Sequence, residues 1–299
     1  MTRPLSSSTG GCKGLPIRQY LRLFRLYRAR NRDFALHDFH HVFLGALQCL
    51  QAYGSKPLRE TDILEIGCGQ RFGSTLLFHS LGAKITGIDY DVVNTTRSWS
   101  GFKALARTNG VGRATKSLVR QIFFDPQYYA ILERELGQPL QFRSVDVRRM
   151  DARALAFENS SFDYIFSNAV FEHIDDVEAA TREVARVLIP GGIARIGVHL
   201  YPSLSGGHHP EWAYPDEQAS ARVPPWDHLR ERHDVGHVYL NELREADFLE
   251  VFRKHLKIME VTSAYEGRQH LTRSIIRELV RYSEEDLLKR SITVILRKE

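Results

Sequence analysis

The chain lacks several features that would place it in a specialised class of proteins. It has no run of about 18 apolar residues, so a membrane-spanning helix is not expected. The first 14 residues are polar and contain no apolar core of a signal peptide. The sequence has only three cysteines, Cys12, Cys49 and Cys68, and their positions match neither a disulfide framework nor a metal site. These absences predict a cytoplasmic protein.

Two further features narrow the class of function. The sequence has no internal repeat and no basic, aromatic-interleaved module of the kind that binds RNA, so no nucleic-acid partner is expected. The net charge of +5 is unevenly distributed, because residues 1–33 contain one lysine and seven arginines against one aspartate. That segment carries +7 and leaves −2 for the remainder. The basic excess therefore belongs to an N-terminal extension, residues 1–55, and not to the catalytic domain expected over residues 56–299.

The N-terminal extension is expected to be helical. Between residues 17 and 30, apolar side chains fall near one helical face: Ile17, Tyr20, Leu21, Phe24 and Tyr27. A basic amphipathic helix of this kind can make weak contact with an anionic membrane surface or meet a phosphorylated substrate. We favour a plainer interpretation, in which the aromatic face packs on the protein and the arginines face solvent. A second helix is predicted over residues 34–53, with Gly54 as its stop.

The most informative segment joins two apolar runs. The first run ends in a turn of small residues, Gly67, Cys68 and Gly69, and the second ends in Asp89, 22 residues after Gly67. Glycine allows the backbone to approach a ligand closely, because it has no Cβ. A carboxylate can accept hydrogen bonds from both hydroxyls of a ribose, and the spacing is near the roughly 20 residues typical of this arrangement. The segment predicts a nucleotide pocket at the carboxyl ends of two parallel strands.

The turn itself indicates which nucleotide is bound. The dinucleotide fingerprint requires a third glycine where this chain has Phe72, and Gly73 comes one residue late. Glu65 begins the turn, and its carboxylate would repel phosphates but attract the sulfonium and ammonium groups of S-adenosylmethionine. The alternative role for Glu65 is only to hydrogen-bond the turn. Two other functions stay open, an NAD-dependent oxidoreductase and a catalytically silent protein that binds S-adenosylmethionine.

Further motifs follow in order along the chain. They are DARALAF at residues 151–157, SFDYIFSN at 161–168, FEHI at 171–174 and LIPGG at 188–192. With the glycine turn and Asp89, this set resembles the class I, Rossmann-like S-adenosylmethionine-dependent methyltransferases over residues 61–200. It is most similar to the type 11 subgroup, which includes the ubiquinone and menaquinone C-methyltransferases. Two positions depart from the family pattern. Arg71 replaces a third glycine, so the turn is expected to be wider or to reach its glycine at Gly73, and Ala156 replaces a proline.

The resemblance implies a fold and a set of roles. The fold is α/β, a doubly wound, mostly parallel, seven-stranded Rossmann-like sheet. The residues implied at the cofactor are Glu65, Gly67, Cys68 and Gly69 at the methionine part, Asp89 at the ribose, Asp151 and the Ala152 amide at the adenine, and Asn168 near the methionine part. Asp146 is a rival for the adenine contact. His173 is the candidate general base, with capping and packing as its alternative role.

The remaining pattern predicts alternating helices and strands. Helices are expected over residues 72–81, 126–136, 176–188, 241–255 and 271–281, and strands over 62–66, 84–88, 140–145, 162–166, 193–200, 257–262 and 292–296. An insertion over residues 91–139 is interpreted as a lid or cap on the pocket. Residues 201–236 form a loop-rich, substrate-facing region, and residues 237–299 supply the C-terminal helix and strand elements.

The loop-rich region and the end of the preceding strand contain six of the 13 histidines, His199, His208, His209, His228, His233 and His237. Their spacing matches no metal-ligand pattern, so substrate contact is favoured over a metal and no metal site is predicted. For any single one of them, the leading interpretation is a solvated loop histidine. The sequence therefore predicts methyl transfer to a small-molecule, glycan or lipid-like acceptor, with oxygen favoured over carbon or nitrogen. Because a sulfonium is an activated leaving group, the protein mainly has to align the two reactants.

Overall fold

The computed structural model describes residues 17–95, 98–217, 219–230 and 239–299. Within these residues the strands are β1 (Asp62–Ile66), β2 (Lys84–Asp89), β3 (Asp146–Arg149), β4 (Phe162–Asn168), β5 (Leu188–His199), β6 (Lys257–Tyr265) and β7 (Lys289–Arg297). They form one seven-stranded sheet in the order β3-β2-β1-β4-β5-β7-β6. The first five strands of that order pair in parallel, whereas β7 runs antiparallel to both β5 and β6. The expected mostly parallel α/β sheet is confirmed.

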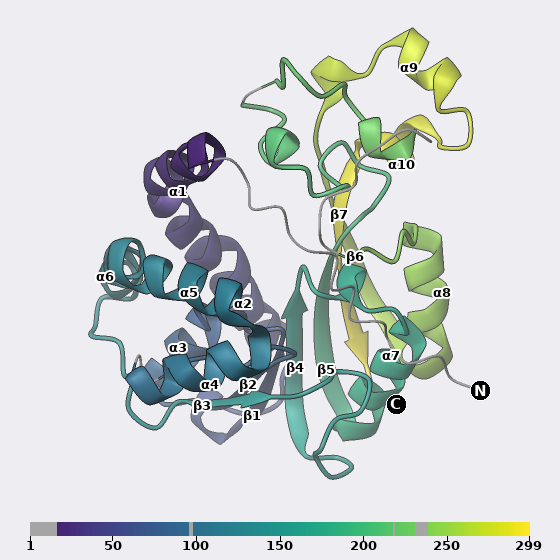
Figure 1. The fold of residues 1–299 in the computed structure, drawn as a ribbon. Coiled ribbons are helices and arrows are strands. Elements are labelled where there is room, and N and C mark those ends of the chain that lie inside the picture. Colours follow the sequence, from purple (N-terminus) through teal and green to yellow (C-terminus); the bar gives the residue numbers. More distant parts are fainter. Residues whose placement is uncertain (1–16, 96–97, 218, 231–238) are drawn as a thin grey trace, which may run out of the picture.

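The central strands are buried on both faces because helices cover both sides of the sheet. Successive residues of a strand point to opposite faces. Ile63 accordingly packs into one apolar cluster, with Phe78 and Phe166, and Leu64 packs into another, with Val184. Figure 1 shows α1 to α6 on one side of the sheet and α7 and α8 on the other. A parallel sheet covered in this way leaves its carboxyl edge as the place where loops can form a site.

The N-terminal segment is one continuous helical run and not two separate helices. It comprises α1 (Ile17–His37), a π-helical segment (Asp38–Phe43) and α2 (Leu44–Tyr53), so the break expected between residues 30 and 34 is wrong. Helical backbone continues there because Asn31 and Ala35 are buried against the rest of the protein. The ring of Phe24 contacts those of Phe123 and Phe124, at centroid distances of 5.7 and 5.0 Å. This contact agrees with the plainer interpretation of the basic helix.

The insertion after β2 is helical. It contains α4 (Trp99–Asn109), α5 (Val111–Phe123) and α6 (Asp125–Leu136), and the last of these is the helix expected over residues 126–136. Gly110, with φ +88°, separates α4 from α5. Tyr128 and Leu132 of α6 are fully buried in the same apolar cluster as Ile63. The insertion is therefore packed onto the domain.

The remaining helices are α3 (Gly73–Ser80), α7 (Val177–Val187), α8 (Glu245–His255), α9 (Arg273–Glu278) and α10 (Glu284–Leu288). Most lie within the expected ranges, but α10 was not predicted. The expected third strand, residues 140–145, is wrong because β3 begins only at Asp146. Leu140 packs into the core from a loop, and Ser144 has a φ of +63°, which ends the loop before strand pairing starts.

The loop-rich region has a small core of its own. Trp212 and Trp226 are buried with Leu204, Leu279 and Leu287, so this region packs on the C-terminal helices. Two of the six histidines expected to face a substrate, His233 and His237, lie outside the described residues. In the described part of the chain, no helix combines the length and the hydropathy that crossing a membrane requires.

Candidate functional site

The glycine turn after β1 forms one side of the site. Gly67 and Gly69 have φ values of +78° and +65°, in the left-handed region that favours glycine. A Cβ on Gly67 would lie 2.2 Å from Cγ2 of Val170, whereas a Cβ on Gly69 would have nothing within 4 Å. Gly67 is therefore required by packing, and Gly69 faces open space through which a ligand can approach the backbone.

Asp89, the last residue of β2, lies directly beside this turn. One carboxylate oxygen accepts a hydrogen bond from the Gly69 N–H (2.9 Å), and the other accepts from the Asp91 N–H (2.8 Å). Burial raises the pKa of Asp89, and the hydrogen bond from Gly69 and the charge of Arg113 offset only part of that effect. Each oxygen keeps a lone pair for a further donor, such as a ribose hydroxyl.

Glu65 lies beneath the turn and is buried. Its carboxylate accepts a hydrogen bond from the hydroxyl of Thr75 in α3. Burial raises the pKa of Glu65 to about 7, because few polar groups replace the lost water. The contact with Thr75 is a structural role, although its partner is a side chain of α3 and not the backbone of the turn that the alternative interpretation of Glu65 named. A nearby cation would in addition favour the charged carboxylate.

Cys68 is a packing residue in this turn. Its side chain is buried, and its Cβ and Sγ lie 3.1 and 3.2 Å from the place where a Cβ on Gly87 would be. Burial raises the pKa of the Cys68 thiol well above its usual value. A thiol held neutral in this way is a poor nucleophile.

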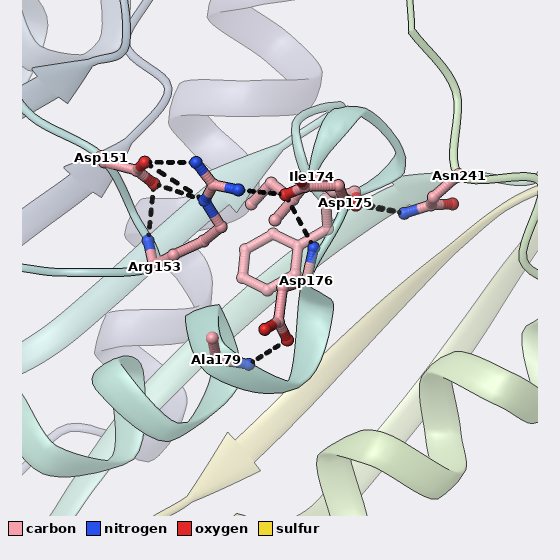
Figure 2. A network of polar contacts seen from close by, with 8 residues as sticks. Asp151, Arg153, Ile174, Asp175, Asp176, Ala179 and Asn241 are labelled. Carbon is pink, nitrogen blue, oxygen red and sulfur yellow. Dashed lines mark hydrogen bonds and ion pairs between the residues drawn. The ribbon is translucent and has the colours of Figure 1, made fainter. Parts of the chain in front are cut away.

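Asp151 follows β3 at the same edge of the sheet. The Met150 N–H donates to the backbone oxygen of Asp89 (2.9 Å), which brings the two acids to neighbouring strand ends. Figure 2 shows that the side chain and the backbone N–H of Arg153 both bind the Asp151 carboxylate. This pairing lowers the pKa of Asp151, and Arg153 also contacts Asp175. Asp151 thus lies at the carboxyl edge of the sheet, with its oxygens shared with Arg153.

The rival residue, Asp146, lies at the other end of its strand. It is the first residue of β3 and accepts a hydrogen bond from Thr86 (2.9 Å), near the start of β2. This geometry excludes Asp146 from the carboxyl edge. Asn168, in contrast, is the last residue of β4, and its Oδ1 lies 2.7 Å from the place where a Cβ on Gly197 would be.

Comparison with known proteins finds matches to part of the chain. A family model described as "Methyltransferase domain" matches residues 108–196. A malonyl-[acyl-carrier protein] O-methyltransferase of Halorhodospira halophila is 28% identical over 149 residues, which cover 47% of this chain and 46% of that protein. Both matches support the predicted class I S-adenosylmethionine-dependent methyltransferase over part of the chain. The match spans about half the length of the curated relative.

Solved structures resemble the chain more distantly. An S-adenosylmethionine-dependent methyltransferase described as putative, from Listeria monocytogenes, is 14% identical, with 86% of this chain and 97% of that chain covered and a TM-score of 0.47. A geranyl diphosphate C-methyltransferase from Streptomyces coelicolor is also 14% identical, with 90% and 84% covered and a TM-score of 0.47.

The structure departs from the expected turn at Arg71 and Gly73. Arg71 points away from the turn, where it binds Asp125 (3.0 Å) and Asn31 (3.0 Å). Gly73 begins α3, and a Cβ there would lie 2.2 Å from the hydroxyl of Tyr128. The expectation that the turn reaches its glycine at Gly73 is therefore wrong, because Gly73 makes room for the insertion. Arg71 instead ties the cofactor turn to α1 and α6.

His173 lies in a 3-10 turn after β4, Phe171–His173. Its Nδ1 is 2.9 Å from the backbone oxygen of Tyr239. Since a carbonyl oxygen only accepts, Nδ1 carries the proton and Nε2 of the neutral ring keeps a lone pair. Asn241 holds this turn through side-chain hydrogen bonds to the oxygens of Phe171 (2.8 Å) and Ile174 (2.9 Å), the second of which is drawn in Figure 2.

The histidines of the loop-rich region separate into different roles. His199, at the end of β5, and His173 each lie with their ring centroids 4.9 Å from that of His208. In contrast, His228 is buried and contacts the backbone oxygen of Tyr201 (2.8 Å), and His209 accepts from the Glu211 N–H (3.1 Å). Only part of the predicted substrate-facing set therefore gathers at the carboxyl edge.

Glu172, which the sequence analysis did not assign to the site, lies beside these rings. Burial raises the pKa of Glu172 to about 8 and lowers that of His208 to about 4. Burial also lowers the pKa of His199 well below its usual value. The position of Glu172 in the E-H pair after β4 was the available sequence signal, but it gave no indication that His199, at the end of β5, and His208, beyond it, would join Glu172.

A separate hollow of about 590 Å³ lies among the C-terminal elements. Its lining includes Glu266, Arg268, Glu284 and Glu285. None of the residues predicted for the cofactor or for catalysis lines it. The candidate site at the carboxyl edge of the sheet is therefore distinct from this hollow.

Proposed function

We propose that the protein transfers a methyl group from S-adenosylmethionine to an oxygen atom of a small-molecule, glycan or lipid-like acceptor. The observation that carries the proposal is the meeting of the open Gly69 backbone, Asp89 and Asn168 at one edge of the sheet. In open α/β sheets, ligands bind at the carboxyl ends of the strands. The match to the methyltransferase family supports the same reading.

The residues present fit this cofactor. Gly69 leaves space for a ligand against the turn, and Asp89 is placed to accept from the ribose hydroxyls. Glu65 supplies a buried carboxylate whose charged form a cation favours. Asp151, with the Ala152 amide, would meet the adenine. When bound, S-adenosylmethionine supplies a methyl group activated by its sulfonium.

The acceptor would lie on the β4–β5 side, against the insertion and the loop-rich region. His173 is the proposed base, because its Nδ1 is fixed by Tyr239 and its Nε2 is left able to take a proton. Oxygen is favoured as the acceptor atom because the curated relative is an O-methyltransferase. Exposed apolar side chains on the insertion, such as Trp99 and Ile122, suit an acceptor with an apolar part.

Calorimetric titration with S-adenosylmethionine and S-adenosylhomocysteine tests the cofactor site. Asp89→Ala should weaken binding more than tenfold, or about 1.4 kcal/mol, because the ribose loses its carboxylate. Asp146→Ala is the matched control, since that acid lies at the opposite end of its strand. Unchanged affinity in Asp89→Ala would remove Asp89 from its role. Absence of binding by the folded wild-type protein, or preference for NAD, would overturn the proposal.

Transfer of a labelled methyl group to a panel of hydroxyl and carboxylate acceptors tests the reaction. With an acceptor found, His173→Ala should lower turnover at saturating cofactor by about 10²–10⁴-fold, the usual contribution of a general base. The affinity for S-adenosylmethionine should stay the same. Wild-type turnover in this variant would leave His173 with a packing role. Binding of the cofactor without transfer to any acceptor would favour a silent binding protein.

A further inference from the structure

The carboxyl ends of β4 and β5 bring together three side chains of the kind that bind transition metals. One donor atom each from Glu172, His199 and His208 lies within 4.8 Å of the other two. The ligands of a tetrahedral zinc ion are about 3.4 Å apart, given metal–ligand distances of about 2.0–2.2 Å. Small side-chain rotations would therefore close the set around an ion.

Two of these groups have unsatisfied polar atoms. Glu172 is 3% exposed, and neither of its carboxylate oxygens has a hydrogen bond of good geometry within the described part of the chain. Nε2 of His208 is also buried without a partner among the same residues. Buried polar atoms are normally paired, and a carboxylate left unpaired is costly. A cation bound by the three residues would pair with one donor atom from each of them.

His199 has the second contact that metal-bound histidines usually show. Its Nε2 is 2.9 Å from Oγ of Ser205, and that hydroxyl donates to the carboxylate of Glu266 (2.6 Å). Ser205 therefore accepts from the ring, so Nε2 carries the proton and Nδ1 keeps its lone pair. A polar group on the far nitrogen fixes the ring and its tautomer, as in known metal sites.

We propose that Glu172, His199 and His208 form a binding site for one divalent transition-metal ion of the zinc class. Two imidazoles and one carboxylate leave at least one coordination position open, as in catalytic zinc sites. Mg²⁺ and Ca²⁺ prefer oxygen ligands and should bind weakly. The site would lie beside His173, whose ring is 4.9 Å from that of His208. Holding an acceptor oxygen at the open position would be its use, and that use alone rests on the proposed function.

The test is a metal titration of the full chain after dialysis against EDTA, with Zn²⁺ followed by calorimetry and Co²⁺ by its visible absorption. We expect one ion per chain for each metal and at least tenfold weaker binding of Mg²⁺. Glu172→Gln and His208→Asn should each weaken Zn²⁺ binding more than tenfold. Asparagine is chosen because His208 has a φ of +52°, which asparagine tolerates.

His209→Asn is the matched control, because His209 is the next residue and lies outside the cluster; it should bind Zn²⁺ like the wild type. Circular dichroism of each variant checks that it is folded. No stoichiometric binding by the folded wild type would overturn the proposal, and so would equal affinity in Glu172→Gln and His208→Asn. Titration with S-adenosylhomocysteine in EDTA is read separately, so failure of the metal site is distinguishable from failure of the cofactor site.

Discussion

The two halves of the carboxyl edge are built in different ways. On the β1–β2 side, Gly67, Gly69 and Asp89 belong to one strand–helix–strand unit, and backbone turns and strand register place them. On the β4–β5 side, Glu172 and His208 come from different segments, and the backbone oxygen of Glu172 accepts a hydrogen bond from Asn241, still further along the chain. The first half is a property of local sequence, whereas the second exists only in the folded chain. Substitutions in the two halves should therefore differ in their effects on stability, cofactor binding and turnover.

The largest expected effect is a loss of stability on the β1–β2 side, where local backbone geometry places the residues. Gly67→Ala adds a Cβ 2.2 Å from Val170 at a φ of +78°, so strain and overpacking combine. We expect a loss of about 2–5 kcal/mol in the free energy of unfolding. Gly69→Ala meets no atom within 4 Å and should cost only about 1–2 kcal/mol, the left-handed strain alone. Urea denaturation measures both.

The same two substitutions distinguish an effect on stability from an effect on cofactor binding. Gly69→Ala should weaken S-adenosylmethionine binding at least tenfold while the protein stays folded, because its methyl group enters the ligand's space. If Gly69→Ala binds the cofactor normally, the turn does not approach the ligand at this residue. If both variants lose the same stability, the packing role assigned to Gly67 is wrong.

The second prediction uses the buried acid under the turn. Burial raises the pKa of Glu65 from 4.5 to about 7, so the folded protein holds this proton more tightly than the unfolded chain. Stability from this group is therefore fully present below pH 4.5 and is lost as the pH rises through 7, by about 3 kcal/mol. Glu65→Gln should remove that part of the pH dependence. The measurement is the difference between the two free energies of unfolding from pH 4 to 8.

For cofactor binding, Glu65 should give a pH dependence opposite to the one that it gives for stability. A cation favours the charged carboxylate, so the affinity of the wild type for S-adenosylmethionine should rise between pH 5 and 8, with a proton released on binding. Titrations in two buffers of different ionisation enthalpy detect that proton. If the affinity of the wild type changes with pH no more than that of Glu65→Gln, then Glu65 only accepts the hydrogen bond of Thr75.

These differences also explain what could be predicted from the sequence. The strands β1, β2 and β4 are apolar runs that end in glycines, an acid or Asn168, so both the strands and the residues at their ends were recognisable. The third strand was misplaced because Leu140 and Phe142 alternate like strand residues but pack from a loop.

The other side of the edge could not be predicted in this way. His199 and His208 have no metal-like spacing, and Glu172 is separated from them by the whole of α7 and β5. Likewise, Arg71 looked like a defect in a glycine turn, and only the fold shows that it pairs with Asp125 in the insertion. Long-range contacts of this kind leave no periodic trace in the sequence.

The smallest expected effect tests whether the β4–β5 side depends on distant supports. Asn241→Ala removes two hydrogen bonds to the turn that carries Glu172 and His173, which should cost about 1–2 kcal/mol of stability. Because the turn then moves more freely, turnover should fall more than tenfold, while the affinity for S-adenosylmethionine stays within twofold of the wild type. Asn241→Asp is the sharper variant, since it keeps the size of the side chain but turns its donor into an acceptor facing two carbonyl oxygens. If either variant weakens cofactor binding as much as turnover, the two halves of the edge are mechanically one unit, and the contrast drawn between them fails.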